Sequence, residues 1–319
     1  MRFYFAVLMV LSLFFSCSDK KQPQIDVSNI KVDFSIKRYD VDFYTATKKT
    51  LPKIKQKYPY LFPIEFTDSL AFAKINDKQE QELFDETQKK YYDFSSTEKE
   101  IKYLFKYVKY YNPNFLAPNV VTMLTNIDYD SKIIYADSLL FVSLDVYLGK
   151  NHQFYADYPK YVKENNTKDH LIVDVANSII DQQLHPSNKR RFIDKMISEG
   201  KKMYLLDLYL PYKSNKEKIG FSTDKLNWAL ANEKEIWMYF IDKKILFSTD
   251  TKLNKRFLDD APFSKFYMEQ DNLSPGKIGV WLGWQIVTSY MKHNDVSLQE
   301  LLKMDEDKIF KKSKYKPKK

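Results

Sequence analysis

The chain of 319 residues carries 51 Lys and Arg against 42 Asp and Glu, with a single cysteine. One cysteine excludes an internal disulfide, so the fold must depend on its hydrophobic core. A hydrophobic content of 44% is typical of a globular protein and excludes a disordered one. Without Arg2 and the six lysines of residues 311–319, 44 basic and 42 acidic side chains remain, so the body is nearly neutral. This balance argues against a nucleic-acid partner.

Residues 1–16 have the layout of a bacterial signal peptide. Arg2 gives a positive start, residues 3–15 form an apolar core, and Ser16 is a small residue before Cys17. A cysteine at this place is the usual lipid-attachment point of a bacterial lipoprotein, so cleavage would leave an acylated Cys17 as the first mature residue. The signal predicts a chain that leaves the cytoplasm and is tethered to membrane lipid by two or more acyl chains.

Two alternatives to the lipidation signal stay open. A transmembrane helix needs roughly 20 apolar residues, and the 13 of the apolar core fall short of that length. Cys17 could also stand beside an ordinary cleavage site, because Phe14 and Phe15 are bulkier than the residues usual there. Beyond the signal we predict a lipidated tether at 17–30, a single globular domain at 31–310 and a basic disordered tail at 311–319.

The first part of the predicted globular domain combines an extended segment with helices. Residues 31–44 alternate apolar and polar side chains, which indicates a strand or an extended edge segment. Helical patterns follow, with Pro52 expected to break or kink the first of them. Ser95 and Glu98 have the spacing of a capping box. The helices predicted here are 45–58, 77–92 and 95–111.

A run of β-branched and apolar residues marks the middle of the chain. Residues 120–128, 132–136 and 139–149 indicate strands, joined by turn-like segments rich in Asp and Ser. Apolar side chains on both faces are typical of a sheet that helices cover. The predicted fold class is therefore α+β, mainly helical, with a small sheet of two to four strands near residues 120–148.

Helices dominate the rest of the chain. We expect Gly200 to interrupt one helix and residues 245–248 to form a short strand or a turn. Residues 274–276 should begin another helix, with serine as its N-cap and proline at its first position. Ser297 and Glu300 form a second predicted capping box. The helices predicted here are 169–184, 188–210, 222–239, 274–292 and a short one after 297.

The chain contains none of the common catalytic or metal-binding motifs. Its four histidines lie far apart without an HExxH zinc motif, and neither a G-x-S-x-G turn nor a glycine-rich phosphate loop occurs. His170 and Asp174 are one helical turn apart, and Asn177 continues their stripe. That stripe could hold a metal weakly, but a solvent-facing or hydrogen-bonded role is the more ordinary one. We expect no catalytic residue, no cofactor and no bound metal.

Three of the six glycines lie within residues 275–287. Gly279 and Gly283 are four residues apart, so they share one face of the predicted helix, flanked by Trp281 and Trp284. Small residues at this spacing allow a second backbone to approach closely, which predicts tight helix packing. The alternative is a groove wall beside a ligand.

Five segments carry a family resemblance: SLDVYLGKNHQFY (143–155), YPKY (158–161), HLIVDVANSII (170–180), LNWALANEKEIWMYF (226–240) and SPGKIGVWLGWQIVTSYM (274–291). Together they resemble the gliding-motility lipoprotein GldB family, in order and over nearly all of the mature chain. The resemblance implies a cell-envelope lipoprotein that is needed for surface gliding and for the associated type IX secretion machinery. It implies no enzymatic activity.

That family is in turn distantly similar to zinc-dependent proteases. The similarity implies that Val173 and Asn177 stand where two zinc-binding histidines would be, and that Glu233 stands where a glutamate ligand would be. Valine cannot bind zinc and asparagine binds it poorly, so the chain would be a degenerate zincin-like scaffold kept for binding. Candidates for its vestigial pocket are His170, Asp174, Asn177 and Glu233.

The leading hypothesis is a non-catalytic lipoprotein that holds protein components of the gliding and type IX secretion apparatus near a membrane. Acylated Cys17 would anchor it in the outer membrane, facing the periplasm. A second hypothesis is a zinc-dependent hydrolase with a non-standard site of His170, Asp174 and Glu233. A third is a cell-wall glycan-binding lipoprotein that uses surface Trp and Tyr side chains.

Overall fold

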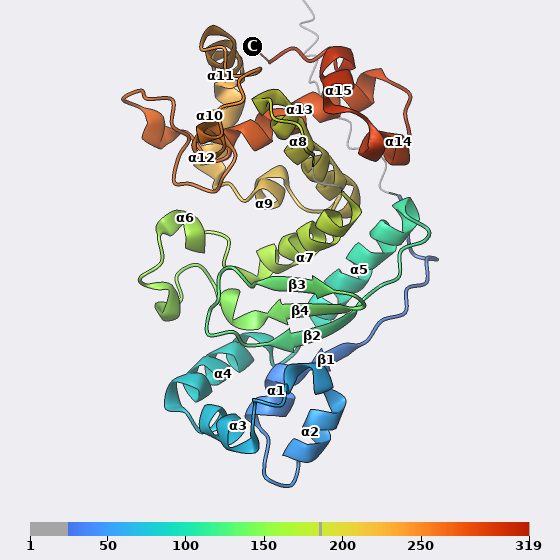
Figure 1. The fold of residues 1–319 in the computed structure, drawn as a ribbon, viewed down its shortest axis with the longest axis vertical. Helices are drawn as coiled ribbons and strands as arrows, with labels where there is room; N and C mark the ends of the chain where they lie inside the picture. Colours follow the sequence, from blue (N-terminus) through green and yellow to red (C-terminus); the bar gives the residue numbers. More distant parts are fainter. Residues whose placement is uncertain (1–24, 185–186, 319) are drawn as a thin grey trace, which may run out of the picture.

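The computed structural model describes residues 25–184 and 187–318. The predicted signal peptide (1–16) and Cys17 lie outside these residues. Figure 1 shows an elongated molecule, with a small sheet and the N-terminal helices toward one end and the C-terminal helices at the other. None of the helices in residues 25–184 and 187–318 combines the length and the apolar composition of a membrane-spanning segment.

One four-stranded mixed sheet has the strand order β1-β2-β4-β3. β2 pairs in parallel with β1 on one side and β4 on the other, and β3 pairs antiparallel with β4 across a tight turn at residues 137–138. The centre of β2 is buried completely, as expected for a strand covered on both faces. The strands are β1 (Ile36–Arg38), β2 (Asn119–Met123), β3 (Ile133–Ala136) and β4 (Leu139–Ser143). The α+β prediction, mainly helical with a small sheet, is confirmed.

The extended segment predicted at 31–44 is a strand only at its centre, because the chain turns directly from β1 into a helix. A buried carboxylate holds this turn. Arg38 donates to both oxygens of Asp40 (3.0 and 2.7 Å), and the Thr122 hydroxyl on β2 donates to the same carboxylate. The prediction of a strand or an extended edge segment over 31–44 missed this side-chain pairing, which joins residues 82 positions apart.

The N-terminal helices differ from prediction at two of their starts. Pro52 does not break a helix; it stands in the first turn of α2, where its missing N–H costs nothing. The predicted capping box of α5 is absent, because Asp93 accepts the N–H of Ser95 (2.9 Å) instead. The helices are α1 (Tyr39–Tyr44), α2 (Leu51–Lys57), α3 (Asp68–Ile75), α4 (Lys78–Tyr91) and α5 (Ser95–Tyr111), with a 3-10 turn at Pro59–Leu61.

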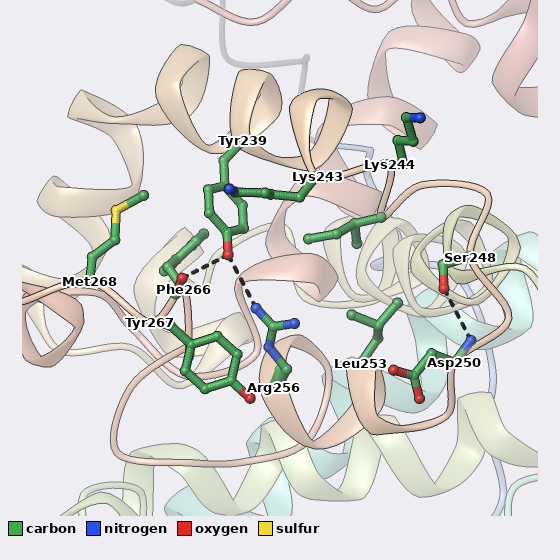
Figure 2. A pocket seen from close by; sticks show the side chains of 11 residues that line it. Tyr239, Lys243, Lys244, Ser248, Asp250, Leu253, Arg256, Phe266, Tyr267 and Met268 are labelled. Atoms are coloured by element: carbon green, nitrogen blue, oxygen red, sulfur yellow. Dashed lines mark hydrogen bonds between the residues drawn. The ribbon is translucent and has the colours of Figure 1, made fainter.

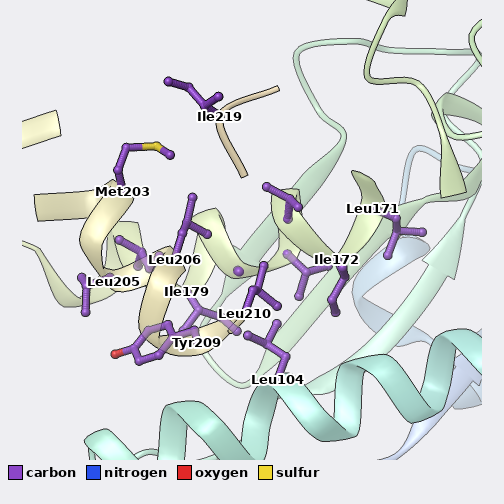
Figure 3. Close-up of a cluster of buried hydrophobic side chains, with 14 of the residues drawn as sticks. Leu104, Leu171, Ile172, Ile179, Met203, Leu205, Leu206, Tyr209, Leu210 and Ile219 are labelled. Carbon is purple, nitrogen blue, oxygen red and sulfur yellow. The ribbon is translucent and has the colours of Figure 1, made fainter. Parts of the chain in front are cut away.

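The helix α7 lies at the centre of the molecule. It packs against β3, α5, α8 and α9, so it joins the sheet to the C-terminal helices. Figure 3 shows the apolar side chains of this junction, which include Leu104 of α5, Ile172 of α7 and Leu206 of α8. The elements of this part are α6 (Lys160–Lys163), α7 (Lys168–Gln183), α8 (Phe192–Tyr209), α9 (Asn215–Ile219) and 3-10 turns at Leu144–Val146 and Gln153–Tyr155.

Gly200 does not interrupt α8 as predicted. Its small size serves packing: a Cβ there would lie 2.3 Å from the backbone carbonyl group of Gly283. The close contact with α13 (Ile278–His293) outweighs the helix-propensity cost of glycine, which is about 1 kcal/mol. Residues 245–248 form a turn and not a strand. The predicted helix 222–239 is two helices, α10 and α11, which meet at Asn232.

The start of α13 also differs from prediction. Ser274 donates to the carbonyl groups of Ser264 (3.2 Å) and Asp271 (2.7 Å), so it does not cap the helix. The helix begins after Lys277, which has a left-handed φ of 43°. The capping box of Ser297 and Glu300 is confirmed. The elements are α10 (Thr223–Ala231), α11 (Glu233–Asp242), α12 (Lys252–Phe257), a 3-10 turn at Asp271–Leu273, α13 (Ile278–His293), α14 (Leu298–Lys303) and α15 (Glu306–Lys312).

Both ends of the described chain pack on the body. In the predicted tether, Val27 is buried and the Ser28 carbonyl accepts from Lys106 (2.6 Å). In the predicted tail, α15 continues to Lys312 and Tyr315 donates to Glu233 (2.7 Å). The prediction of a disordered segment is therefore wrong for the described residues 311–318. Their composition is rich in lysine, but Ser313 is buried and Tyr315 binds Glu233.

Candidate functional site

The predicted stripe on α7 forms a polar cluster around Asp174. His170 Nε2 lies 3.5 Å from Asp174 Oδ1, and Asp174 Oδ2 accepts from the Tyr147 hydroxyl (2.8 Å). Lys132, just before β3, places its ammonium 3.9 Å from the same carboxylate. Asn177 follows one turn later, half-buried. The structure therefore supports a hydrogen-bonded role for Asp174, and it places His170 beside this carboxylate.

Burial controls the protonation of this cluster. It lowers the pKa of His170, against the opposing influence of Asp174, so the imidazole stays neutral near pH 7. It also lowers the pKa of Lys132. Across from α7, Lys277 and Asp260 form an ion pair (2.8 Å), which holds the pKa of Asp260 below its usual range. Within the cluster, the two lysines therefore balance the charges of the two carboxylates.

The structure does not assemble a metal site from the predicted residues. Among residues 25–184 and 187–318, no three His, Cys, Asp or Glu side chains converge to hold an ion. Glu233 begins α11 and accepts from Tyr315, so it does not join His170 and Asp174. Val173 is buried in the core. The ligand set suggested for a non-standard hydrolase is thus wrong, and the four vestigial-pocket candidates do not share one pocket.

The glycine cluster is a helix-crossing point. A Cβ at Gly283 would lie 1.8 Å from the carbonyl oxygen of Met196 on α8, and one at Gly279 would lie 2.9 Å from that of Phe257. Trp281 and Trp284 are both buried, so neither lines an open groove. The Trp284 indole donates to Asp207 of α8 (2.6 Å), which adds a directed bond to the crossing.

A hollow of about 510 Å³ lies between the end of α11, the turn after it, α12 and the segment 266–268. We call it the α11–α12 pocket; Figure 2 shows it. Its charged side chains are the three cations Lys243, Lys244 and Arg256 and one carboxylate, Asp250, and its aromatic side chains include Tyr239 and Tyr267.

Sequence reasoning missed the α11–α12 pocket. The available signal was charge: residues 243–256 contain five basic side chains and one acidic side chain, in a body that is nearly neutral. The pairing of this segment with Tyr267 arises only from tertiary structure.

The comparison with protein families decides the identity. The model of the gliding motility protein GldB family matches residues 20–317. The chain belongs to the GldB family. The resemblance found in the sequence is confirmed, and it associates the protein with gliding motility and the cell envelope. Comparison with curated proteins and with solved structures gives no match.

The GldB match spans the α7 cluster, the glycine crossing and the α11–α12 pocket together. All three features therefore belong to the part of the chain that defines the family. The distant similarity of GldB proteins to zinc-dependent proteases stays a prediction.

Proposed function

We propose that this GldB-family protein is a lipid-anchored, non-catalytic binding component of the gliding-motility and type IX secretion apparatus. The observation that carries the proposal is the family match, which begins at residue 20, three positions after Cys17, the predicted lipid-attachment residue. Lipid on Cys17 would hold the folded body at the membrane, in the outer membrane facing the periplasm. The body would act by binding protein components of the machinery.

Lipid anchoring is tested by Cys17→Ser in the native bacterium, with Ser16→Ala as the control, since alanine is also a small residue before the cysteine. We expect the Cys17→Ser protein to be absent from washed membranes and to fail to restore gliding and type IX secretion in a deletion strain. The Ser16→Ala protein should behave as wild type. Normal membrane retention of the Cys17→Ser protein, or normal gliding of the deletion strain, would refute the proposal.

The orientation is tested by protease treatment of intact and of permeabilised cells. A periplasm-facing body should be digested only after the outer membrane is permeabilised. Digestion in intact cells would place the body on the outer surface instead.

The non-catalytic role is tested at the α7 cluster, where a proton-transferring group would be found if the protein were a hydrolase. His170→Gln removes the only imidazole of this cluster and keeps a hydrogen-bonding side chain of similar reach. We expect this variant to restore gliding fully. If a folded His170→Gln protein accumulated at wild-type level and gliding were lost, a catalytic role would be favoured. Zinc analysis of the purified mature chain gives an independent readout, with about one zinc per chain arguing for the hydrolase.

A further inference from the structure

The α11–α12 pocket holds cations without ion-pair partners. Among the described residues, no carboxylate forms an ion pair with Lys243, Lys244 or Arg256. In a second hollow, of about 580 Å³, three of the four lysines are already engaged: Lys277 pairs with Asp260 (2.8 Å), Lys150 pairs with Glu164 (2.8 Å), and Lys225 donates to the Ser274 carbonyl (2.6 Å). Unpaired cations around a hollow attract an anionic ligand, so the α11–α12 pocket is the stronger candidate site.

Hydrogen bonds and aromatic rings fix the position of the Arg256 guanidinium. Its Nε donates to the Lys265 carbonyl (2.9 Å) and its Nη2 donates to the Tyr239 hydroxyl (3.2 Å). Its guanidinium carbon lies 4.4 Å from the centre of the Tyr267 ring and 4.6 Å from that of Phe257. In Figure 2 the other terminal nitrogen points into the hollow. A planar guanidinium fixed in this way is suited to a carboxylate, because little side-chain entropy remains to be lost on binding.

The segment opposite Arg256 is strained and exposed. Tyr267 has a left-handed φ of 64°, unfavourable for a bulky residue, yet its side chain is 77% exposed. Asp271 fixes this conformation by accepting the N–H groups of Tyr267 (2.8 Å) and Met268 (3.3 Å). Tyr239 also donates to the Phe266 carbonyl (2.7 Å). Strain that the surrounding structure maintains at an exposed aromatic residue points to a binding role.

An apolar hollow adjoins the cations. It has a volume of about 180 Å³ and shares Tyr239, Phe266 and Met268 with the α11–α12 pocket. Trp228 and Ile236 form its apolar part, and the carboxylates Glu235 and Asp271 lie at its polar edge, where Asp271 already accepts the N–H groups of Tyr267 and Met268. Met238 and Ile241 of α11 and Met268 are each exposed by half or more. The surface therefore offers an apolar area next to cations that can bind a carboxylate.

We propose that the α11–α12 pocket and this adjoining hollow bind an acidic segment of a protein partner, with an Asp or Glu carboxylate on Arg256 and a neighbouring apolar side chain against Trp228. The inference rests on the proposed function, since it locates the partner-binding face of the scaffold. A polypeptide fits better than a phosphate or an anionic glycan, because either of those would leave the apolar hollow unfilled. Charge pairing would steer the partner, and the buried apolar side chain would hold it.

The test is photocrosslinking in the native bacterium, with benzoylphenylalanine in place of the exposed Met268. We expect a crosslink to a protein, and the crosslinked peptide identified by mass spectrometry should be rich in Asp or Glu. Lys243→Gln/Lys244→Gln in the same chain should lower the yield by about tenfold or more, the equivalent of one charge pair. Because both lysines are exposed, this variant changes charge and leaves the core intact.

Two controls make the result specific. Benzoylphenylalanine at the exposed Tyr92, in the N-terminal half, should not give the same product. The matched pair Lys48→Gln/Lys49→Gln, also adjacent and exposed, should leave the yield unchanged. Arg256→Gln should abolish the crosslink, and circular dichroism would establish that this variant is folded.

A crosslink only to lipid or glycan, a product insensitive to Lys243→Gln/Lys244→Gln, or no crosslink at position 268 would each overturn this inference. If the gene deletion nevertheless abolished gliding, the proposed function would stand without it. If the deletion left gliding and secretion normal, the proposed function itself would fail.

Discussion

Gly283 of α13 lies directly against the carbonyl oxygen of Met196 on α8, at a point where a Cβ atom would stand 1.8 Å from that oxygen. No side-chain rotation can relieve such a contact, because the backbone fixes the position of a Cβ atom and the carbonyl oxygen belongs to the main chain. The two helices must therefore separate if any larger residue replaces the glycine. The crossing is the most extensive contact between elements of the described structure.

Gly283→Ala should destabilise the protein by about 3 kcal/mol or more, since overpacking here forces a backbone shift. In thermal unfolding followed by circular dichroism, this corresponds to a fall in Tm of about 6 °C or more. Thr288→Ala, at an exposed position on the same helix, is the control and should change stability by less than about 0.5 kcal/mol. Equal stability of the two variants would show that the helices do not meet at Gly283.

Tyr315 should anchor the C-terminal segment through the buried Glu233. Its hydroxyl donates to Glu233 Oε1, and Oε2 of that carboxylate has no hydrogen-bond partner among the described residues. Tyr315→Phe should cost about 1–3 kcal/mol, because it leaves a buried carboxylate without its donor. Denaturant unfolding of Tyr315→Phe, Glu233→Gln and the double variant should give a coupling energy above about 0.5 kcal/mol. Additive effects would show that the two side chains do not interact.

His170 should make the protein less stable in mild acid. Burial lowers the pKa of His170 below its unfolded value near 6.5, so the unfolded chain binds a proton more readily than the folded one. Stability from this group is complete above about pH 6.5 and is lost as the pH falls toward the lowered folded pKa. His170→Gln should lose less stability than wild type between pH 7 and pH 5, measured by urea unfolding. The control is His293→Gln, at an exposed position outside this cluster.

The protonation of Asp145 should change stability with pH in the opposite direction to that of His170, over nearly the same pH range. The fully buried carboxyl accepts the N–H groups of Thr125 (3.0 Å) and Ile127 (2.7 Å), yet burial raises its pKa to about 6. Its folded form therefore holds a proton more tightly than the unfolded chain does, and stability from this group is lost as the pH rises from about 4 to 6.

The Asp145→Asn variant should lack this loss, so its stability relative to wild type should rise by about 3 kcal/mol from pH 4 to pH 7. Urea unfolding at a series of pH values measures this difference, with Asp137→Asn in the exposed β3–β4 turn as control. A difference that stays constant with pH would contradict the raised pKa of Asp145.

Local patterns predicted most of the elements. The helix α4 was expected at 77–92 and runs from Lys78 to Tyr91, with Asp77 accepting two N–H groups of its first turn. The residues of β2, β3 and β4 were also recognised, because β-branched runs between turn residues are distinctive. Boundaries set by distant partners were missed: the Ser264–Ser274 pairing delays the start of α13, and Asp40 ends β1.

The candidate sites were harder to predict than the elements. The pairing of His170 with Asp174 follows from helical spacing, and so does the shared face of Gly279 and Gly283. The expectation that Glu233 would join His170 failed, because its partner is Tyr315, 82 residues further along the chain. The basic composition of residues 243–256 indicated the cations of the α11–α12 pocket, but it did not indicate that they lie close to Tyr267.

The amino-acid sequence by itself indicated the α+β class and membership of the GldB family, and it predicts a lipidation signal, because these depend on local patterns and on ordered runs of residues. The tertiary structure alone decided which polar groups meet. Arg256 lies beneath Tyr267, and Glu233 lies beside Tyr315, only because helices distant in sequence pack together and bring their side chains into contact. Hydrogen bonds and ion pairs act over a few ångströms, so sequence spacing cannot reveal partners that folding brings together from far apart.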